Sequence, residues 1–217
     1  MDERWLSNAY VLGDAPGGTA VFVDSGAPLG PLLDLVERER LTPTHLLRTH
    51  SHHDHVEHEE EIGRRFGIPV VTGDIVTGGL DIRALSLPGH SDDGLAFVVN
   101  ETLCFSGDIL FKDAVGGGPA DVVRHSVMEG LMTLSPDICV LPGHTEETTI
   151  GREWESNPFV VHWRGESPSL GEAVEIAGEA AELFVWSPDY DGNGKALVRF
   201  TDGREAIVGG SRVERGG

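Results

Sequence analysis

Hydrophobic residues alternate between short continuous runs and helical spacing along the first forty residues. Apolar runs at 9–12 and 18–24 flank a turn cluster rich in Gly and Pro at 14–18, which predicts a β-hairpin. From 28 to 40 the apolar positions recur at intervals of three and four, which predicts an amphipathic helix. The positions that carry this spacing are Leu29, Leu32, Leu33 and Val36.

The alternation of strand-like and helix-like segments continues to residue 141. Helical spacing predicts helices over 54–66, ending at Gly67, and over 120–134. Alternating strands and helices are typical of an α/β fold in which helices cover both faces of layered sheets. Short apolar runs predict the strands at 46–47, 70–71, 82–87, 95–99, 102–106 and 138–141.

The pattern changes after about residue 155. We predict irregular structure over 155–170 and a domain boundary within it, which divides the chain into residues 1–165 and 166–217. Beyond the boundary, short apolar runs separated by hairpin turn signals predict a small β appendage, either an SH3-like barrel or a roll. These runs lie at 173–176, 183–186, 196–200 and 205–208.

Composition narrows the classes of function. The chain has 36 acidic and 16 basic residues, a formal net charge of −20, whereas proteins that bind nucleic acids or anionic membrane surfaces carry basic patches. We therefore expect no nucleic-acid partner and no membrane partner, and no apolar run approaches the roughly 18 residues of a membrane span. Residues 1–5 lack the basic and apolar regions of a signal peptide, so a cytoplasmic location is expected.

Four of the ten histidines fall within residues 50–55, directly after the predicted strand at 46–47. Neutral imidazole is the commonest metal ligand in proteins. In an extended turn, His50 and His52 would point the same way, whereas Asp54 and His55 could face a second point nearby. This short segment therefore predicts ligands for two metal ions.

Three later predicted strands each end in a glycine turn that carries a further potential ligand. Glycine lets the backbone turn sharply and approach other groups closely. Together with the histidine cluster, these turns predict a metal centre at the strand ends. Their sequences are Leu87-Pro88-Gly89-His90, Phe105-Ser106-Gly107-Asp108 and Leu141-Pro142-Gly143-His144.

These segments together resemble the metallo-β-lactamase-fold hydrolase superfamily. Its H-x-H-x-D-H motif matches residues 50–55, and the stretch Phe-Ser-Gly-Asp-Ile-Leu-Phe at 105–111 looks like its F-[ST]-G-D-x-L-F segment. Leu-Pro-Gly-His-Thr at 141–145, with the segments at 149–153 and 157–159, looks like the glyoxalase II-like (hydroxyacylglutathione hydrolase-like) branch. The resemblance covers residues 5–162 and implies an αββα sandwich with its site at the strand ends.

The resemblance also implies a ligand set and a cofactor. Two divalent metal ions are implied, with zinc expected and iron or manganese as alternatives. Asp54 would also be the catalytic residue that orients the attacking hydroxide. The implied ligands are His50, His52 and His90 for one metal, Asp54, His55 and His144 for the other, and Asp108 as a bridge between them.

Hydrolysis of an acyl thioester, such as a hydroxyacyl-thiol, by a metal-bridging hydroxide is the leading function that the resemblance implies. We expect a small anionic thioester as substrate, with Lys112 and Arg124 as candidate contacts, and a homo-oligomer formed through the appendage. Asp24 ends the strand at 18–24 and is either an orienting partner of a metal ligand or a turn or helix-cap residue.

Two alternatives stay open. A persulfide dioxygenase of the same fold would use one iron ion and molecular oxygen, and the first-site histidines with Asp108 would suffice for it. A metal-stabilised interaction protein would bind partners through the appendage without catalysis. The complete second-site set favours the binuclear hydrolase. The predicted β appendage stands where typical glyoxalase II enzymes carry a helical domain that contacts glutathione, so the thiol is left open.

Overall fold

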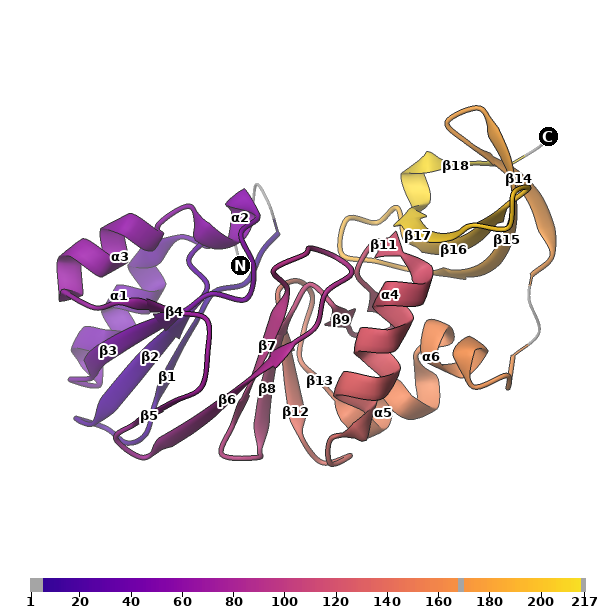
Figure 1. Ribbon diagram of the computed structural model, residues 1–217. Coiled ribbons are helices and arrows are strands. Elements are labelled where there is room, and N and C mark those ends of the chain that lie inside the picture. The colour runs from indigo at the N-terminus through magenta and orange to yellow at the C-terminus, as the bar shows by residue number, and fades with distance from the viewer. Residues whose placement is uncertain (1–5, 168–169, 216–217) are drawn as a thin grey trace.

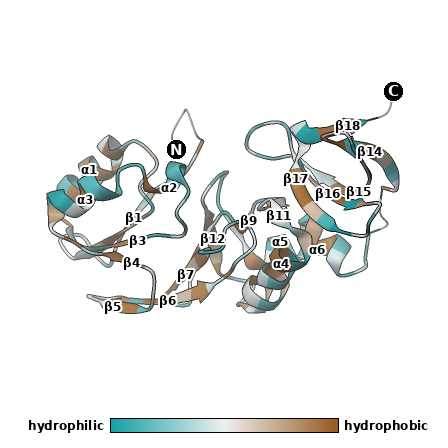
Figure 2. Cartoon of the chain, turned by 45° about the horizontal axis from the view of Figure 1, so that its top comes forward, coloured by the Kyte–Doolittle hydropathy of each residue, from teal (hydrophilic) through white to brown (hydrophobic). Residues whose placement is uncertain are grey.

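The body of the protein is an αββα sandwich in which two sheets pack face to face between two layers of helices (Figure 1). The computed structural model describes residues 6–167 and 170–215; residues 1–5, on which the signal-peptide expectation rests, lie outside it. Hydrophobic residues concentrate on strands such as β6 and β7, whereas helix α3 carries hydrophilic residues (Figure 2). In the described part of the chain, no helix is both long and apolar enough to span a membrane.

The first sheet has the order β1-β2-β3-β4. Its first two strands form the expected antiparallel hairpin, and β2, β3 and β4 run parallel to one another. Two helices cover its outer face around the buried side chains Phe22, Leu46 and Ile62. The elements are β1 (Tyr10–Gly13), β2 (Thr19–Val23), α1 (Leu29–Arg38), β3 (Thr42–Leu47), α3 (Glu59–Phe66) and β4 (Val70–Val71).

The second sheet has the order β13-β12-β8-β7-β6-β5. Its inner face packs on the first sheet through a shared apolar cluster that includes Val21, Leu47, Phe97 and Phe105. Burial of such large side chains on both sheets is what holds the two layers together. The strands are β5 (Ile75–Thr77), β6 (Leu80–Ser86), β7 (Leu95–Val99), β8 (Leu103–Gly107), β12 (Cys139–Pro142) and β13 (Thr148–Thr149).

Helices and short strands complete the outer side of the second sheet. α4 (Ala120–His125) continues through a π-helical turn (Ser126–Gly130) and a 3-10 turn (Leu131–Thr133), so the segment predicted as a helix over 120–134 is helical to Thr133 with three kinds of turn. The remaining elements of the body are β9 (Leu110–Phe111), β10 (Ala114–Val115), β11 (Gly118–Pro119), α5 (Ile150–Ser156) and α6 (Pro158–Trp163).

The helix predicted over 54–66 is divided into α2 (His53–Val56) and α3. The loop after β2 enters at this point, because the Ser25 N–H donates to His55 O at 2.7 Å and the His58 N–H donates to Ser25 O at 3.1 Å. These bonds satisfy backbone groups that a continuous helix would pair within itself. The break therefore comes from a contact distant in sequence.

The irregular structure predicted over 155–170 is wrong for its first part, because α5 and α6 occupy residues 150–163. Asn157-Pro158 marks a helix start rather than a loop. The Asn157 side chain accepts a hydrogen bond from the Phe159 N–H at 3.0 Å, and Pro158 takes the first helical position. Both are favourable at a helix N-terminus.

Five C-terminal strands and β11 form a six-stranded antiparallel sheet in the order β11-β17-β16-β15-β14-β18. The sheet is open, so among the described residues the barrel alternative is not seen. β11 belongs to the body and pairs with β17. The pattern of the C-terminal residues alone could not predict this strand pairing. The other strands are β14 (Glu172–Ile176), β15 (Glu179–Ser187), β16 (Lys195–Phe200), β17 (Glu205–Gly209) and β18 (Val213–Arg215), with a 3-10 turn at Gly210–Arg212.

The C-terminal sheet packs directly on the body. Phe184 and Leu197 belong to the same buried cluster as Val123 of α4 and Phe159 of α6, and the sheet stands above these helices (Figure 1). The division at 165/166 falls between α6 and β14 and stays a prediction. The shared core implies that the C-terminal sheet is fixed relative to the strand ends that carry the histidines.

Candidate metal centre

The seven side chains expected as metal ligands all lie at one edge of the sandwich. β2 and β3 are parallel, as are β8 and β12, so the segments that follow these strands meet at the same edge. Ligand atoms within 4.8 Å of one another form three groups. The groups are His50, His52 and His90; Asp54, His55 and His144; and His50, His55 and Asp108.

The first group comes from the loop after β3 and the loop after β6. His52 Nδ1 lies 3.0 Å from His50 Nε2 and 3.0 Å from His90 Nε2. His50 is buried, whereas His52 is exposed and His90 is partly exposed. This side of the centre is therefore open to solvent.

The second group gathers around the Asp108 carboxylate, which follows β8. Asp108 Oδ1 lies 3.3 Å from His55 Nε2, and Asp108 Oδ2 lies 3.2 Å from His144 Nε2 and 3.5 Å from His90 Nε2. Asp54 Oδ2 lies 3.4 Å from His144 Nε2. Asp108 is thus the side chain that touches histidines of both groups.

Hydrogen bonds behind the histidines fix which ring nitrogen faces the centre. Asp24 Oδ2 lies 2.8 Å from His55 Nδ1, and the same oxygen accepts a hydrogen bond from Thr49 Oγ1 at 2.7 Å. Because that hydroxyl donates to Asp24, it accepts from His50 Nδ1 at 3.1 Å. The Leu6 carbonyl accepts from His144 Nδ1 at 2.9 Å. In all three rings, Nε2 is the nitrogen that faces the centre.

Asp24 holds this arrangement from a strained position. It is buried, with φ of 55°, a left-handed conformation that is uncommon outside glycine. Pro28, and not Asp24, precedes helix α1. The side chain of Asp24 therefore orients His55, while its backbone forms the turn after β2.

Gly143 leaves room for the closest contacts of the centre. A Cβ atom at this position would lie 2.1 Å from Asp108 Oδ1 and 2.6 Å from His55 Cε1. Any side chain would therefore displace one of these two groups. Gly107, before Asp108, has φ of 50°, and a Cβ there would lie 2.8 Å from Thr49 Cβ, so the glycine turns serve both the close approach and the backbone turn.

Burial keeps two histidines of the first group, His50 and His90, neutral. Loss of hydration lowers the pKa of His50 to about 4 and also lowers the pKa of His90. Both rings are therefore uncharged near neutral pH, the form of imidazole that binds a metal.

The closed side of the centre is charged. Burial would raise the pKa of Asp108, but its contacts with His144 and His55 hold it well below its ordinary value. Burial would likewise lower the pKa of His55 and His144, but the neighbouring carboxylates outweigh it and raise both. The centre thus holds a carboxylate that needs positive charge close by.

These features fit a divalent metal. Two ligand nitrogens about 2.0 Å from a tetrahedral zinc ion lie about 3.3 Å apart, close to the 3.0 Å separations of the first group. His55 Nε2 and Asp108 Oδ1 are buried without a hydrogen-bond partner among the described residues. Imidazole and carboxylate donors suit zinc, iron and manganese alike.

The residues expected to contact the substrate separate in the structure. Lys112 lines a cavity of about 440 Å³ beside the centre, whereas Arg124, exposed on α4, is not among the residues that line it. Tyr190, from the loop between β15 and β16, lines the same cavity and stacks on His144 with ring centroids 3.9 Å apart and an interplanar angle of 6°. Sequence reasoning missed Tyr190, because no local signal connects it with the histidines.

Comparison with known proteins agrees with this geometry. The family model of the metallo-beta-lactamase superfamily matches residues 2–75. The uncharacterised protein Mb2612c of Mycobacterium bovis is 30% identical over 206 residues, which cover 70% of this chain and 92% of that protein. The hydroxyacylglutathione hydrolase GloC of Haemophilus influenzae is 29% identical over 184 residues, covering 65% of this chain and 87% of GloC.

Three solved structures are also similar. The B3 metallo-beta-lactamase BLEG-1 has a TM-score of 0.67 and 27% identity, covering 71% of this chain and 94% of its own. ETHE1 from Myxococcus xanthus has a TM-score of 0.66 and 26% identity, covering 75% and 86%. TTHA1623, in a di-iron-bound form, has a TM-score of 0.60 and 28% identity, covering 70% and 94%. The chain therefore belongs to the metallo-beta-lactamase superfamily, whose members bind divalent metals.

Proposed function

We propose that this protein is a metal-dependent hydrolase that cleaves an acyl thioester at the centre described above. One observation carries the proposal: the second ligand group is complete and shares Asp108 with the first group. A site for a single metal would need only the first three histidines and a carboxylate. The similarity to GloC, which is named a hydroxyacylglutathione hydrolase, supports a thioester as the bond that is cleaved.

The ligands in this proposal are the seven side chains expected from the sequence, and the metals supply Lewis acidity that polarises a carbonyl and activates water near neutral pH. We infer zinc, with iron or manganese as alternatives; the di-iron-bound form of TTHA1623 supports iron as one of them. Structural metal sites are usually closed tetrahedra, so the open side at His52 and His90 favours a catalytic centre.

We assign to Asp54 the role of orienting the attacking water and accepting its proton. Its side chain is 24% exposed, and its Oδ2 atom lies between His144 Nε2 at 3.4 Å and His55 Nε2 at 3.6 Å. Burial would raise the pKa of Asp54, but the contact with His144 and the charge of His55 lower it below its ordinary value. The carboxylate is therefore ionised and can orient a water molecule and accept its proton.

A thioester suits this set of residues because its leaving group needs little help. A thiol has a pKa of about 8.5, so a thiolate departs without a strong general acid. An amide nitrogen would need a proton donor placed beside it, whereas the side chains within the centre itself are carboxylates and histidines assigned to metal binding or its support.

The alternative is a persulfide dioxygenase that uses a single iron ion and molecular oxygen. The similarity to ETHE1 fits this alternative, and His50, His52, His90 and Asp108 would suffice as its site. The two readings differ in what they need from Asp54, His55 and His144, because only the binuclear hydrolase uses these as ligands.

Metal content measured together with two assays tests the proposal. Protein loaded separately with zinc, manganese or iron is assayed for thiol release from acyl thioesters and for persulfide-dependent oxygen uptake. We expect two metal ions per chain and thiol release without oxygen consumption. One iron ion per chain with oxygen uptake, and no thiol release with any metal, would reverse the choice.

A further inference from the structure

The loop between β15 and β16 brings a residue of the C-terminal sheet to the metal centre. The Tyr190 ring stacks on His144 and also contacts Phe111, with ring centroids 5.9 Å apart. Phe111 in turn meets the His144 ring at 5.8 Å. Tyr190 is thus part of an aromatic group around the last ligand of the second site, contributed by a different sheet from the one that carries the ligand.

This loop is held in place before any substrate arrives. Asp189 Oδ1 accepts a hydrogen bond from the Tyr190 N–H at 2.8 Å, and Asp189 Oδ2 lies 3.1 Å from Lys195 Nζ. The Asp189 side chain is fully buried and that of Lys195 is 14% exposed. Ser187 Oγ donates to the Asp113 carbonyl of the body at 2.6 Å. A loop fixed at both ends loses little entropy on binding.

The cavity beside the centre lies between this loop and the body. Pro188, Asp189 and Tyr190 line one side, and Leu6, Lys112 and Glu146 are among the residues that line the other. Its volume of about 440 Å³ falls within the usual range for small-molecule sites of roughly 300–1,000 Å³. The cavity on the side of His50 and His90 measures only about 10 Å³. The larger part of a substrate therefore fits only on the Tyr190 side of these two cavities.

The charged residues that line the cavity are already paired with one another or with neighbours. Lys112 contacts Glu146, and Asp113 Oδ1 lies 2.8 Å from Arg152 Nη2. With Asp189 paired to Lys195, every charged side chain among the lining residues has an opposite partner. The cavity therefore offers no unpaired charge to a ligand with several charges, whereas a neutral ligand needs none.

We propose that this cavity binds the thiol portion of the thioester, that Tyr190 contacts this portion and sets its selectivity, and that a neutral thiol is preferred over a multiply charged one such as glutathione. The inference rests on the proposed thioesterase function, and in a hydroxyacyl thioester the thiol is the larger part. It replaces the anionic substrate expected with Lys112 and Arg124 as contacts by a substrate that leaves the Lys112–Glu146 pair intact.

Three acetyl thioesters that differ only in the thiol test the inference. They carry methanethiol, N-acetylcysteamine and glutathione, and kcat/KM is measured with metal content for each variant of the full chain. We expect the wild type to favour N-acetylcysteamine over glutathione by about tenfold or more. Tyr190→Ala lowers kcat/KM for the N-acetylcysteamine thioester by about tenfold more than for the methanethiol ester, because only the larger thiol loses an aromatic contact and its buried area.

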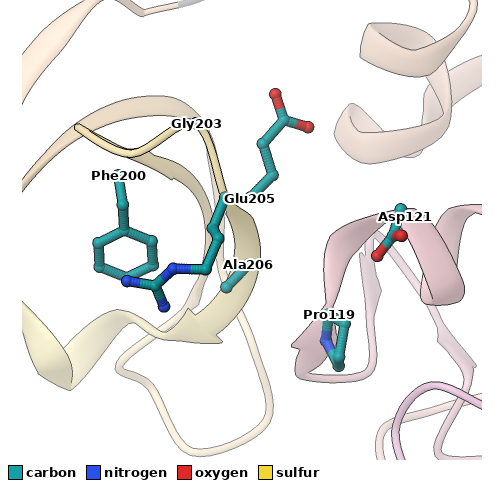
Figure 3. A pocket seen from close by; sticks show the side chains of 7 residues that line it. Pro119, Asp121, Phe200, Gly203, Glu205 and Ala206 are labelled. Carbon is teal, nitrogen blue, oxygen red and sulfur yellow. The ribbon is translucent and has the colours of Figure 1, made fainter.

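Two further variants separate the contact from indirect effects. Glu146→Gln frees Lys112 and raises kcat/KM for the glutathione thioester alone. Phe200→Leu is the matched control: it is an aromatic residue of the same sheet that lines a cavity of about 480 Å³ with Pro119, Arg204 and Ala206 (Figure 3), and it should change none of the three rates.

The outcomes discriminate between the two proposals. An active wild type in which Tyr190→Ala lowers all three rates equally would overturn the inference, because Tyr190 would then act only through His144. A wild type that prefers the glutathione thioester would overturn it as well. A metal-loaded wild type inactive toward all three thioesters would refute the proposed function, and the inference with it.

Discussion

Replacing Gly143 by alanine should disable the metal centre without unfolding the protein. The added Cβ would lie 2.1 Å from Asp108 Oδ1, and Cβ atoms essentially never come closer than 3.0 Å to a heavy atom of a residue that is not a chain neighbour. Asp108 or the backbone of the turn must therefore move by about 0.9 Å or more. The same Cβ lies 2.6 Å from His55 Cε1. A shift of the turn away from the Asp108 carboxylate and toward that ring would therefore create a second clash.

The cost of this shift falls mainly on the reaction. A misplacement of about 1 Å in catalytic geometry lowers rates by roughly 100-fold, which corresponds to about 2.7 kcal/mol of lost transition-state stabilisation. We expect Gly143→Ala to lower kcat/KM for the thioester by about this factor and to weaken binding of at least one metal ion. Metal content by elemental analysis and thiol release measure the two effects.

Gly30→Ala is the matched control. Gly30 lies in α1, and a Cβ there meets nothing within 4 Å. Alanine in a helix interior is favoured over glycine by roughly 0.5–1 kcal/mol, so this variant should keep full activity and melt slightly higher. A Gly143→Ala protein with wild-type activity and two bound metal ions would refute the assignment of Asp108 as the bridge.

Three further substitutions test other parts of the structure. Asp108→Ala should abolish thiol release and lower the metal content, and unchanged metal with full activity would contradict a binuclear centre. Asp24→Asn keeps the backbone conformation but replaces a hydrogen-bond acceptor of His55, so titration with a metal chelator should show affinity weaker by about 10–100-fold. Glu153 is fully buried and accepts four hydrogen bonds. Glu153→Ala should lower the free energy of unfolding by about 3 kcal/mol and Tm by about 6–12 °C. The control Glu155→Ala, at an exposed neighbouring position, should leave Tm unchanged.

The elements predicted from the sequence are those that carry a long local pattern. The α1 helix and the strands β2, β6, β7 and β8 follow their apolar spacing, since each buries one or both faces in a core shared with its neighbours. The two-residue strand β4 was predicted at 70–71, whereas the equally short β9, β10 and β13 were not. Their residues pair because the surrounding chain holds them together, and two residues have no detectable period.

The gathering of the expected ligands at one edge could be predicted because the segments that carry them follow predicted strands. His50 follows β3, Asp108 follows β8 and His144 follows β12, so knowing the strands placed the ligands at one edge. Tyr190 had no comparable signal. Its place beside His144 depends on the packing of Phe184 and its neighbours against the body, and such contacts between distant segments are not encoded in local spacing.

The net charge of −20 and the charge around the cavity act at different ranges. Exposed charges are screened beyond about 8–10 Å at ordinary ionic strength, so the overall excess of acids governs which macromolecules approach the protein. Inside the cavity the ion pairs of Lys112 and Asp189 leave little unbalanced charge, and at the centre bound divalent ions would oppose the carboxylates of Asp54 and Asp108. In the proposed reaction, the charge that the substrate can carry is therefore set by local pairing: bound metals would stabilise negative charge on the carbonyl oxygen, while the paired cavity would favour a neutral thiol portion.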